Sequence, residues 1–316
     1  MLRFLLGRLL TVLPLLLLLT IVVFLLVEIA PGDPAAIIAG PDAPPETVES
    51  IRRDLGLDRP FWERYLSYIG SVLQGDLGTS YRSNEPVLEV IGRALPRTAS
   101  IAALAILISV LLSIPLGVIA AVRRNGLVDR LITGAAVFLL AVPPFVLAVL
   151  LVNSLALSEA RIFPATGYVS MSDDFGQWLR HATLPAVAIA TISLAELTRM
   201  ARGSLIDALE EDYIRTARAK GMGQLRIIAK HAAKNAAIPY VTVLGLNIGR
   251  IVGAAVIVEA IFNIQGFGQL GVEATLGRDL PTMQGVVLVS GLIVLLVNLV
   301  VDISYGYFNP RTRTRT

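Results

Sequence analysis

The sequence contains no cysteine and only two histidines, His181 and His231, which lie far apart along its 316 residues. The absence of cysteine excludes a disulfide framework and a thiolate metal site. No G-x-x-x-x-G-K-S/T sequence occurs, so the chain has no P-loop of its own for ATP. H-E-x-x-H motifs, serine elbows and clustered metal ligands are also absent. We therefore expect no catalytic residue, metal site, cofactor or enzymatic activity in this chain.

Charged residues are scarce as well, at 16% of the sequence, whereas ordinary soluble domains are about one quarter charged. Hydrophobic residues make up 55%, and the mean hydropathy is +0.71. A helix needs about 20 apolar residues to span hydrocarbon, where it satisfies its own backbone groups. Six stretches qualify: Leu9–Ile29, Ala99–Val122, Leu131–Leu155, Ala182–Thr198, Ala237–Ile261 and Met283–Tyr305. The sequence therefore predicts an all-α membrane protein with six transmembrane helices.

The placement of lysine and arginine predicts the orientation of these helices. Both types are in excess on the side that holds the two termini, which indicates cytoplasmic N- and C-termini. The chain then comprises an N-terminal tail and first helix (1–30), an extracytoplasmic loop (31–98), a five-helix core (99–305) and a basic cytoplasmic tail (306–316). The net charge of +3 is small and gives no indication of nucleic-acid binding.

The loop 31–98 carries the signals of three short helices. They are predicted from Pro45 to Gly56, from an Asp58 N-cap to Gly75, and from an Asn84 N-cap through Pro86 towards Leu95. In the second helix, Trp62, Tyr65 and Tyr68 are three residues apart and share one face. Such a face is typical of an aromatic belt at the outer leaflet, and it also suits docking of a soluble partner.

A long charged segment, Arg199–Asn235, separates the fourth and fifth spans. Acidic residues come first and basic residues follow, which suits the dipole of a helix. Gly221 and Gly223 interrupt the basic run, so we expect a short helix, a break and a second helix that returns to the membrane. Small residues at its tip (Ala217, Ala219 and Gly221) allow it to enter a groove of another protein. The alternative is an amphipathic helix that lies on anionic lipid headgroups.

This segment resembles the EAA loop of permease subunits of bacterial ABC importers, which contains a short coupling helix. Ala217 and Gly221 match the general pattern of that loop, whereas Arg215 and Thr216 depart from it. The end of the segment is closer to the peptide-transporter version, H-x-x-x-N-A-x-x-P. The residues that fit this version are His231, Asn235, Ala236 and Pro239.

The resemblance to dipeptide and oligopeptide permeases extends along almost the whole chain. The stretches that carry it include PGDP (31–34), LGLDRP (55–60), GDLGTS (75–80), LPRT (95–98), FPATGY (163–168) and VEAIFNIQGFGQLG (258–271). It implies the permease core of a type I ABC importer in a bacterial inner membrane, with residues 199–236 as the coupling segment. Because permeases for nickel, haem and glutathione share this scaffold, the cargo stays open.

The resemblance also implies partners and roles. The partners are a second homologous permease, two ATP-binding subunits or one fused pair, an extracytoplasmic substrate-binding protein and membrane lipid. ATP-driven closure of the ATPases is expected to move the coupling segment, which transmits the motion to the translocation pathway. The residues implied in this coupling are Asp212, Tyr213, Arg215, Thr216, Ala217, Ala219, Lys220, Gly221 and Met222.

Arg250 is the charge that lies deepest within a predicted span. It is about 20 Å into the fifth helix, where an arginine facing lipid is costly. Gly245, Gly249 and Gly253 on this helix predict a close-packing face, and Asn247 and Arg250 point away from it. We expect these two residues to line the translocation pathway; the alternative is that Arg250 pairs with a carboxylate or carbonyl of a neighbouring helix.

The other charges near span ends are Glu28, Glu196, Glu259 and Asp302, which local pairing or snorkelling accounts for. Two rival functions stay open. A self-contained channel or ion-coupled carrier predicts rows of intramembrane acids or broken helices at the midplane. A membrane-anchored scaffold predicts assembly without transport.

Overall fold

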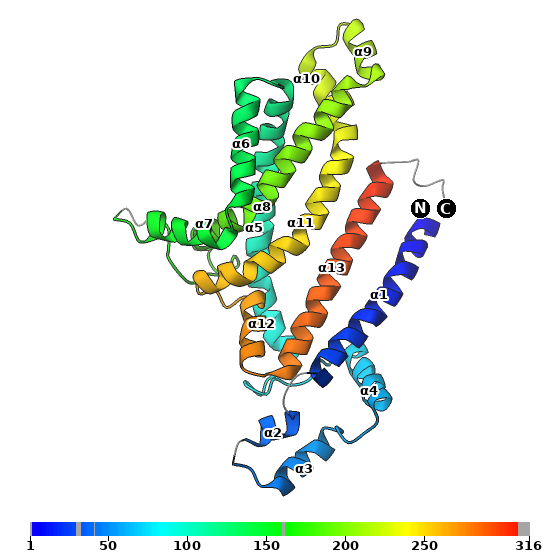
Figure 1. The fold of residues 1–316 in the computed structure, drawn as a ribbon, viewed down its shortest axis with the longest axis vertical. Coiled ribbons are helices and arrows are strands. Elements are labelled where there is room, and N and C mark those ends of the chain that lie inside the picture. The colour runs from blue at the N-terminus through cyan, green and yellow to red at the C-terminus, as the bar shows by residue number, and fades with distance from the viewer. Residues whose placement is uncertain (1, 30–32, 41, 160–161, 309–316) are drawn as a thin grey trace. The chain divides into compact units, whose positions relative to one another are not determined.

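The computed structural model describes residues 2–29, 33–40, 42–159 and 162–308 (Figure 1). Regular structure in these ranges is helical, with one isolated antiparallel bridge between Thr79 and Pro86. The helices are α1 (Leu2–Ile29), α2 (Pro34–Ala39), α3 (Pro45–Asp54), α4 (Phe61–Leu73), α5 (Val87–Val122), α6 (Leu127–Ala141), α7 (Pro144–Leu151), η1 (Val152–Ala156), α8 (Phe175–Glu210), α9 (Asp212–Ala219), α10 (Gln224–Ile227), η2 (Ile228–Ala232), α11 (Ala233–Ile261), α12 (Phe267–Leu276) and α13 (Leu280–Phe308). The predicted all-α class is confirmed.

Five of the described helices are long and apolar enough to cross a membrane, and a bent pair makes a sixth crossing if it is counted as one span. This pair is α6 followed by α7 and η1, with a bend of 97°. The apolar stretch predicted as a span, Leu131–Leu155, is therefore divided between two helices. The cause is the Pro143–Pro144 pair, because a residue before proline avoids the helical region. Val142 accordingly adopts extended backbone with ψ of 116°, and α7 restarts at Pro144.

Two predictions in the loop 31–98 also need correction. Pro60, rather than Asp58, is the N-cap of α4, and no side chain caps this helix. The helix expected to begin near Pro86 is continuous with the second span as α5. It passes through Pro96 because residues before and after that proline, such as Ile91 and Ile101, are buried and hold the helix in place.

The chain divides into two compact units. The first includes Arg97–Gly268, and α8 is its central helix, which packs against α6, α7 and α11. Two thirds (67%) of the most apolar window of α8 is buried in protein, compared with 28% for α11. This burial explains why the fourth span has the lowest hydropathy: alanine and serine on α8 face other helices and allow close approach.

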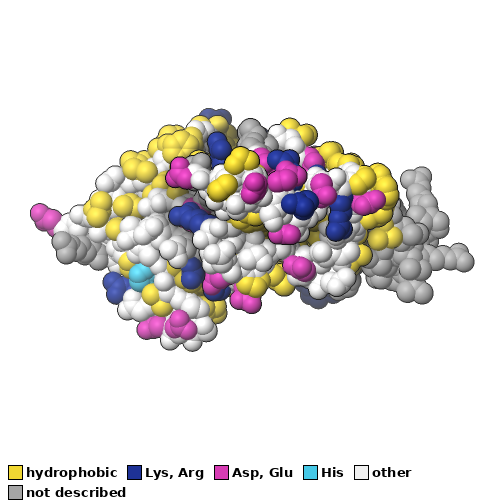
Figure 2. Space-filling model, turned by 90° about the horizontal axis from the view of Figure 1, so that it is seen from below, with side chains coloured by type: hydrophobic (Ala, Val, Ile, Leu, Met, Phe, Trp, Pro, Cys, Tyr) yellow, Lys and Arg dark blue, Asp and Glu magenta, His cyan; other side chains and the backbone are white. Residues whose placement is uncertain are grey.

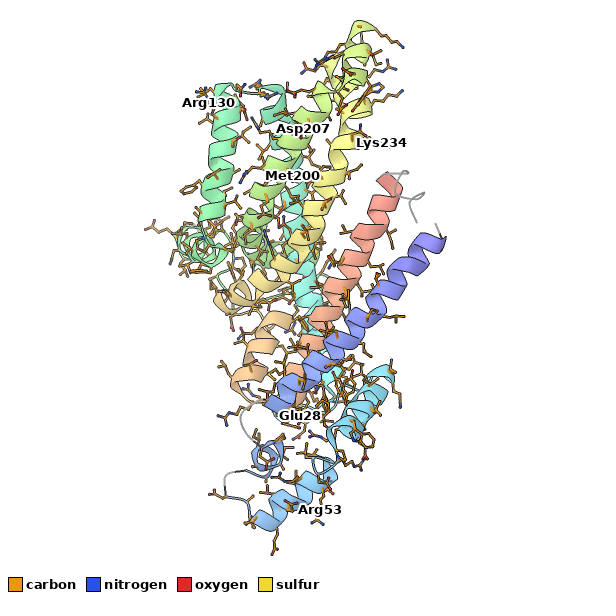
Figure 3. All side chains as sticks on the ribbon, turned by 45° about the vertical axis from the view of Figure 1, so that its right-hand side comes forward. Glu28, Arg53, Arg130, Met200, Asp207 and Lys234 are labelled. Carbon is orange, nitrogen blue, oxygen red and sulfur yellow. The ribbon has the colours of Figure 1, made fainter. Side chains whose placement is uncertain are left out.

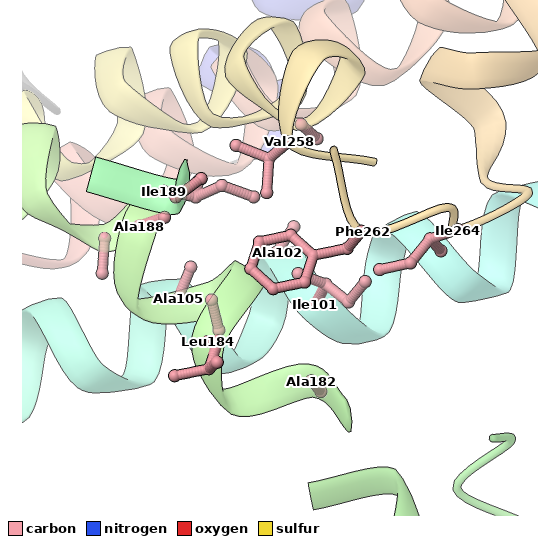
Figure 4. Packing of buried hydrophobic residues seen from close by; sticks show 14 of the residues in the cluster. Ile101, Ala102, Ala105, Ala182, Leu184, Ala188, Ile189, Val258, Phe262 and Ile264 are labelled. Atoms are coloured by element: carbon pink, nitrogen blue, oxygen red, sulfur yellow. The ribbon is translucent and has the colours of Figure 1, made fainter. Parts of the chain in front are cut away.

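The core of this unit is built around Phe262, which is 2% exposed. Figure 4 shows its ring beside Ala102 and Ile101 of α5, with Leu184 and Ile189 of α8 in the same cluster. These residues come from helices that are distant in sequence. Packing of this kind fixes the relative positions of α5, α8 and α11.

The second unit comprises Gly7–Pro96 and Gln269–Leu295. Phe24 of α1 is its aromatic centre, with ring centroids 5.5 Å from Tyr65 and 5.6 Å from Tyr68 of α4. Burial, and to a lesser extent the charge of Tyr65, raises the pKa of Tyr68 to about 12. Trp62 is 60% exposed. The face predicted from Trp62, Tyr65 and Tyr68 is therefore divided: two of its rings pack inward on α1, and only Trp62 is available to lipid or a partner.

Asp279, which is 4% exposed, holds the turn before α13 in the second unit. Its carboxylate accepts hydrogen bonds from Ser80 Oγ at 2.5 Å, Thr282 Oγ1 at 2.7 Å and the Tyr81 backbone N–H at 3.0 Å. Hydrogen bonds thus join the GDLGTS stretch to a residue about two hundred positions later in the sequence.

On the face shown in Figure 2, acidic and basic side chains are interspersed, which is typical of a surface in water because charges in lipid are costly.

Candidate functional site

The segment between the fourth and fifth spans forms a separate short helix, α9, at the end of α8 (Figure 1). Glu211 interrupts α8 with extended backbone, φ −64° and ψ 147°. Asp212 then opens α9, where a negative charge is favourable at a helix N-terminus, and Arg218 lies in the last turn. The predicted arrangement of helix, break and second helix is present in the structure.

The inner face of α9 is apolar and buried. Ile214 is 0% exposed and Ala217 is 5% exposed. Both pack into a second cluster of the first unit, whose other buried members are Ala121, Leu205, Ile206, Ala208, Ile227, Ile228 and Ala232. α9 is therefore seated on protein by an anchor, Ile214, that the motif comparison did not identify. Ala217 was expected among the small residues that let the tip enter a groove of another protein. Its methyl group instead fills this core.

The outer face of α9 is polar and exposed. Asp212 and Arg215 form an ion pair of 3.1 Å with both side chains in solvent, at 92% and 73% exposure. Thr216 and Ala219 are exposed on the same face, and Lys220 follows at the end of the helix. α9 thus presents a small, charged and exposed surface to its surroundings.

Gly221 ends α9 in a geometry that suits glycine. Its φ is +78°, the left-handed region. Its N–H donates to the Arg218 carbonyl at 2.9 Å, and the Met222 N–H donates to the Ala217 carbonyl at 3.2 Å. These two bonds form a Schellman motif, in which the residue after the C-cap is left-handed. Met222 packs against the cluster below α9, so the turn and the anchor hold the helix together.

A partly buried ion pair beneath this segment was not identified from the sequence. Both carboxylate oxygens of Asp129, in the first turn of α6, accept hydrogen bonds from Arg202 of α8, at 2.5 Å and 2.7 Å. The Asn125 backbone N–H also donates to Asp129 at 2.9 Å. Asp129 is 4% exposed at its side chain. An acidic residue in a first helical turn was the available signal, but its partner 73 residues later was not predictable from spacing.

Arg250 of α11 pairs with Glu196 of α8, and 60% of the Arg250 side chain is exposed. Arg199, one turn away on α8, was the local partner available to Glu196, but the packing of α8 against α11 brings Arg250 to it instead. This pairing is the alternative that was expected for Arg250. Asn247 differs from Arg250. It is fully buried, and neither of its side-chain amide atoms has a hydrogen-bond partner among the described residues. The structure thus separates the two residues that were expected to share one face.

The predictions of a close-packing glycine face on α11 and of a snorkelling or locally paired Glu259 hold only in part. Gly245 does meet Val301 closely, but Gly253 is exposed and a Cβ there would meet nothing within 4 Å. Glu259 is not at a snorkelling position: it is 1% exposed, and Thr98 donates a hydrogen bond to its carboxylate. Gly266 lies directly against that carboxylate, where a Cβ would clash. The side chain of Asp302 lies outside the described residues.

Long apolar helices that carry a water-exposed amphipathic helix between two spans define a multi-pass membrane subunit. Comparison of the sequence with protein families gives a direct assignment. The chain belongs to the family of binding-protein-dependent transport system inner membrane components, whose model matches residues 113–314. The model of the membrane component's N-terminal region matches residues 1–102. The resemblance found in the sequence is confirmed.

Similar proteins support the same class. The chain is 38% identical over 311 residues to a protein of Sinorhizobium fredii named "Probable peptide ABC transporter permease protein y4tP", covering 98% of this chain and 99% of that one. It is 37% identical over 337 residues to the dipeptide transport system permease protein DppB of Escherichia coli K12, covering 99% of both. An inward-facing structure of the MetNI methionine ABC transporter matches with a TM-score of 0.58 at 16% identity, over 70% of this chain and 97% of that chain, which shows a shared fold.

Proposed function

We propose that this chain is the permease subunit of an ATP-driven importer of dipeptides and oligopeptides, and that it forms half of the translocation pathway. The relatives named above are peptide and dipeptide permeases that align over almost the whole chain. This supports peptide cargo over nickel, haem or glutathione. The chain performs no hydrolysis; separate or fused ATP-binding subunits supply the energy, and a substrate-binding protein delivers the cargo from outside.

The observation that carries this proposal is the seating of α9. A helix that only rested on lipid would turn its apolar face to the membrane. In α9 that face is occupied by the chain's own core through Ile214, while Asp212 and Arg215 remain in water. A rigid, outward polar surface supports docking on an ATP-binding subunit. The residues proposed for this contact are Asp212, Tyr213, Arg215, Thr216, Ala219 and Lys220, with Gly221 and Met222 shaping the turn and Ala217 supporting it from below.

The two ends of the chain and the segment 199–236 are proposed to lie in the cytoplasm, and the segment 31–98 outside. In this orientation α9 faces the ATP-binding subunits. Their closure pushes α9, and the packed pair α8 and α11 carries the motion into the membrane. Core packing supports this route, because close-packed helices transmit displacement as units rather than deforming locally.

One face of α11 supports a pathway or subunit-contact role. Leu246, Arg250, Gly253 and Ile257 are exposed at helical spacing. A face that contains a mid-span arginine is costly against lipid, so protein or water must cover it. A second homologous permease opposite this face would enclose a passage between the two chains. Arg250 is proposed to line that passage, and Asn247 to join it in a conformation where its amide gains a partner.

The test uses the complete transporter in proteoliposomes, with ATP-driven uptake of a labelled dipeptide as the readout. Reversing the outer charges of α9 (Asp212→Lys with Arg215→Glu) is expected to abolish uptake and release the ATP-binding subunits, while Glu46→Lys on the exposed face of α3 leaves both intact. Uptake by this chain alone would instead indicate a channel or carrier. Assembly of the complete complex without cargo flux would indicate a scaffold.

A further inference from the structure

A groove of about 640 Å³ runs along α8 in the first unit, and α6 and α11 form its other walls. The α8 residues that line it include Glu196, Arg199, Gly203 and Asp207, whose spacing of three and four residues places them on one helical face. Figure 3 shows Met200 and Asp207 in succession along α8 towards α9. The volume is in the range of sites that hold small ligands.

Charged residues of both signs line the groove along α8: Glu196, Arg199, Arg202 and Asp207. Glu196 lies at the groove end farthest from α9, followed by Arg199 and then Asp207. Arg199 is exposed and makes no ion pair among the described residues. At the same end, Glu196 is 28% exposed and holds Arg250, which is 60% exposed. The groove therefore offers an accessible cation, Arg199, and an accessible anion, Glu196, one helical turn apart on α8.

The two charges of the Arg250–Glu196 ion pair are accessible to water and can separate at little energetic cost. Pairs with water access contribute little to stability because water solvates the separated charges. The pair between Asp129 and Arg202 is a contrast in the same unit: Asp129 is 4% exposed and receives two guanidinium hydrogen bonds, so separation would bury an unpaired charge. The Arg250–Glu196 pair is therefore suited to exchanging its partners for those of a ligand, whereas the Asp129–Arg202 pair is suited to stabilising the fold.

We propose that the Arg250–Glu196 pair and the adjoining groove form a transient site for the charged ends of a peptide in transit. This inference deepens the proposed peptide function and rests on it. Arg250 releases Glu196 and takes the peptide's carboxylate, for which a guanidinium is a bidentate partner, while Glu196 takes the ammonium group. One ion pair is exchanged for two, so no charge is left unpaired. When the peptide moves on towards Arg199, the original pair re-forms.

The first experiment separates exchange from a structural role. In the reconstituted complete transporter, Arg250→Leu with Glu196→Leu removes both charges and leaves none unpaired. We expect uptake of labelled dialanine per ATP hydrolysed to fall by at least about tenfold, with complex yield and ATP hydrolysis retained. Arg250→Lys with Glu196→Asp, which keeps both charges, should restore most of the uptake. The matched control is the exposed Arg93–Glu85 pair, changed to leucine in the same way, where uptake should stay at the wild-type rate. Wild-type uptake by the Arg250 and Glu196 double leucine variant would overturn the proposal.

The second experiment needs no delivery protein and remains informative if a variant assembles poorly. A dipeptide of benzoylphenylalanine and alanine is photo-cross-linked to the wild-type complex, and the labelled peptides are mapped. Labelling is expected within 196–207, and the C-terminal amide of the same dipeptide should label this range several-fold less. Equal labelling by the two forms overturns the inference alone. A wild-type complex that hydrolyses ATP and moves another solute but no peptide overturns the proposed peptide function itself.

Discussion

The Tyr213 hydroxyl of α9 accepts a hydrogen bond of 2.8 Å from the side-chain amide of Asn235 in α11, 22 residues later in the sequence. α9 is therefore held by the buried Ile214 on one side and by a polar tether to the next span on the other. Asn235 was singled out in the sequence for its match to the peptide-transporter motif, and Tyr213 as a residue that the resemblance implies in coupling. In the structure these two residues are hydrogen-bonded to each other, and the bond links α9 to α11.

Removing the tether should loosen α9 without removing its outer charges. Tyr213→Phe loses one hydrogen bond, which contributes about 0.5–1.5 kcal/mol. We expect fewer peptides to be moved per ATP hydrolysed in proteoliposomes, because part of the ATPase motion is lost at the joint. Asn235→Ala should have a similar effect, and the double variant should be no worse than either single one. Independent, additive losses would show that the two residues do not act as a pair.

Gly221 and Gly223 provide a matched pair of substitutions. A Cβ would meet nothing within 4 Å at either position, so space does not distinguish them. Gly221 has φ +78°, whereas Gly223 has φ −65°, which any residue adopts. Gly221→Ala should therefore cost about 1–2 kcal/mol in the turn that ends α9, and Gly223→Ala close to nothing. Co-purification of the ATP-binding subunits at increasing detergent stringency measures the difference. Equal loss from both variants would contradict the role assigned to the Schellman motif.

Ile214 anchors α9 in the core, so truncating its side chain tests whether α9 must be held rigidly. Ile214→Ala should create a cavity under the helix at a cost of about 2–5 kcal/mol, and Ile214→Val should cost about 0.5–1.5 kcal/mol. We expect graded loss of transport in that order, with the transmembrane helices still folded. Protease sensitivity of 199–236 compared with the rest of the chain reports local loosening. If Ile214→Ala transported as well as the valine variant, rigid seating of α9 would not be needed for coupling.

The Asp129–Arg202 pair should be structural. Asp129→Asn leaves Arg202 without its countercharge. Because the Arg202 side chain is 26% exposed, the cost should lie below the ~3–5 kcal/mol of a fully buried pair. Asp129→Leu with Arg202→Leu removes both charges and should recover most of the thermal stability in detergent. The comparison of melting temperatures for the single and double variants is the measurement. A double variant less stable than the single one would indicate that these side chains serve something other than each other.

The sequence predicted a great deal of this architecture because its signals are local. Apolar runs of sufficient length, the turn residues at Gly221 and Gly223, and the order of acids and bases around α9 all depend on neighbours along the chain. The motif similarity to permeases was readable for the same reason. The Pro143–Pro144 pair was a local signal of a kink as well, but it did not give the size of the bend, which is 97°.

Contacts between side chains that lie far apart in the sequence could not be predicted from it. Glu196 had a basic residue three positions away, and only the antiparallel packing of α8 on α11 gives it to Arg250 instead. Glu259 looked like a carboxylate at a membrane interface, and tertiary structure buries it under Gly266 with Thr98 as donor. Ala217 matched a motif position, yet its place is inside the core.

The amino-acid order by itself determined that this chain is helical, embedded in a membrane and equipped with a polar excursion between two spans, because lipid solubility and helix periodicity act over one segment at a time. The tertiary structure alone decided which charges meet and which face of α9 remains in water. Those outcomes depend on distances between residues that are far apart in sequence, and side-chain packing fixes such distances only when the helices are assembled.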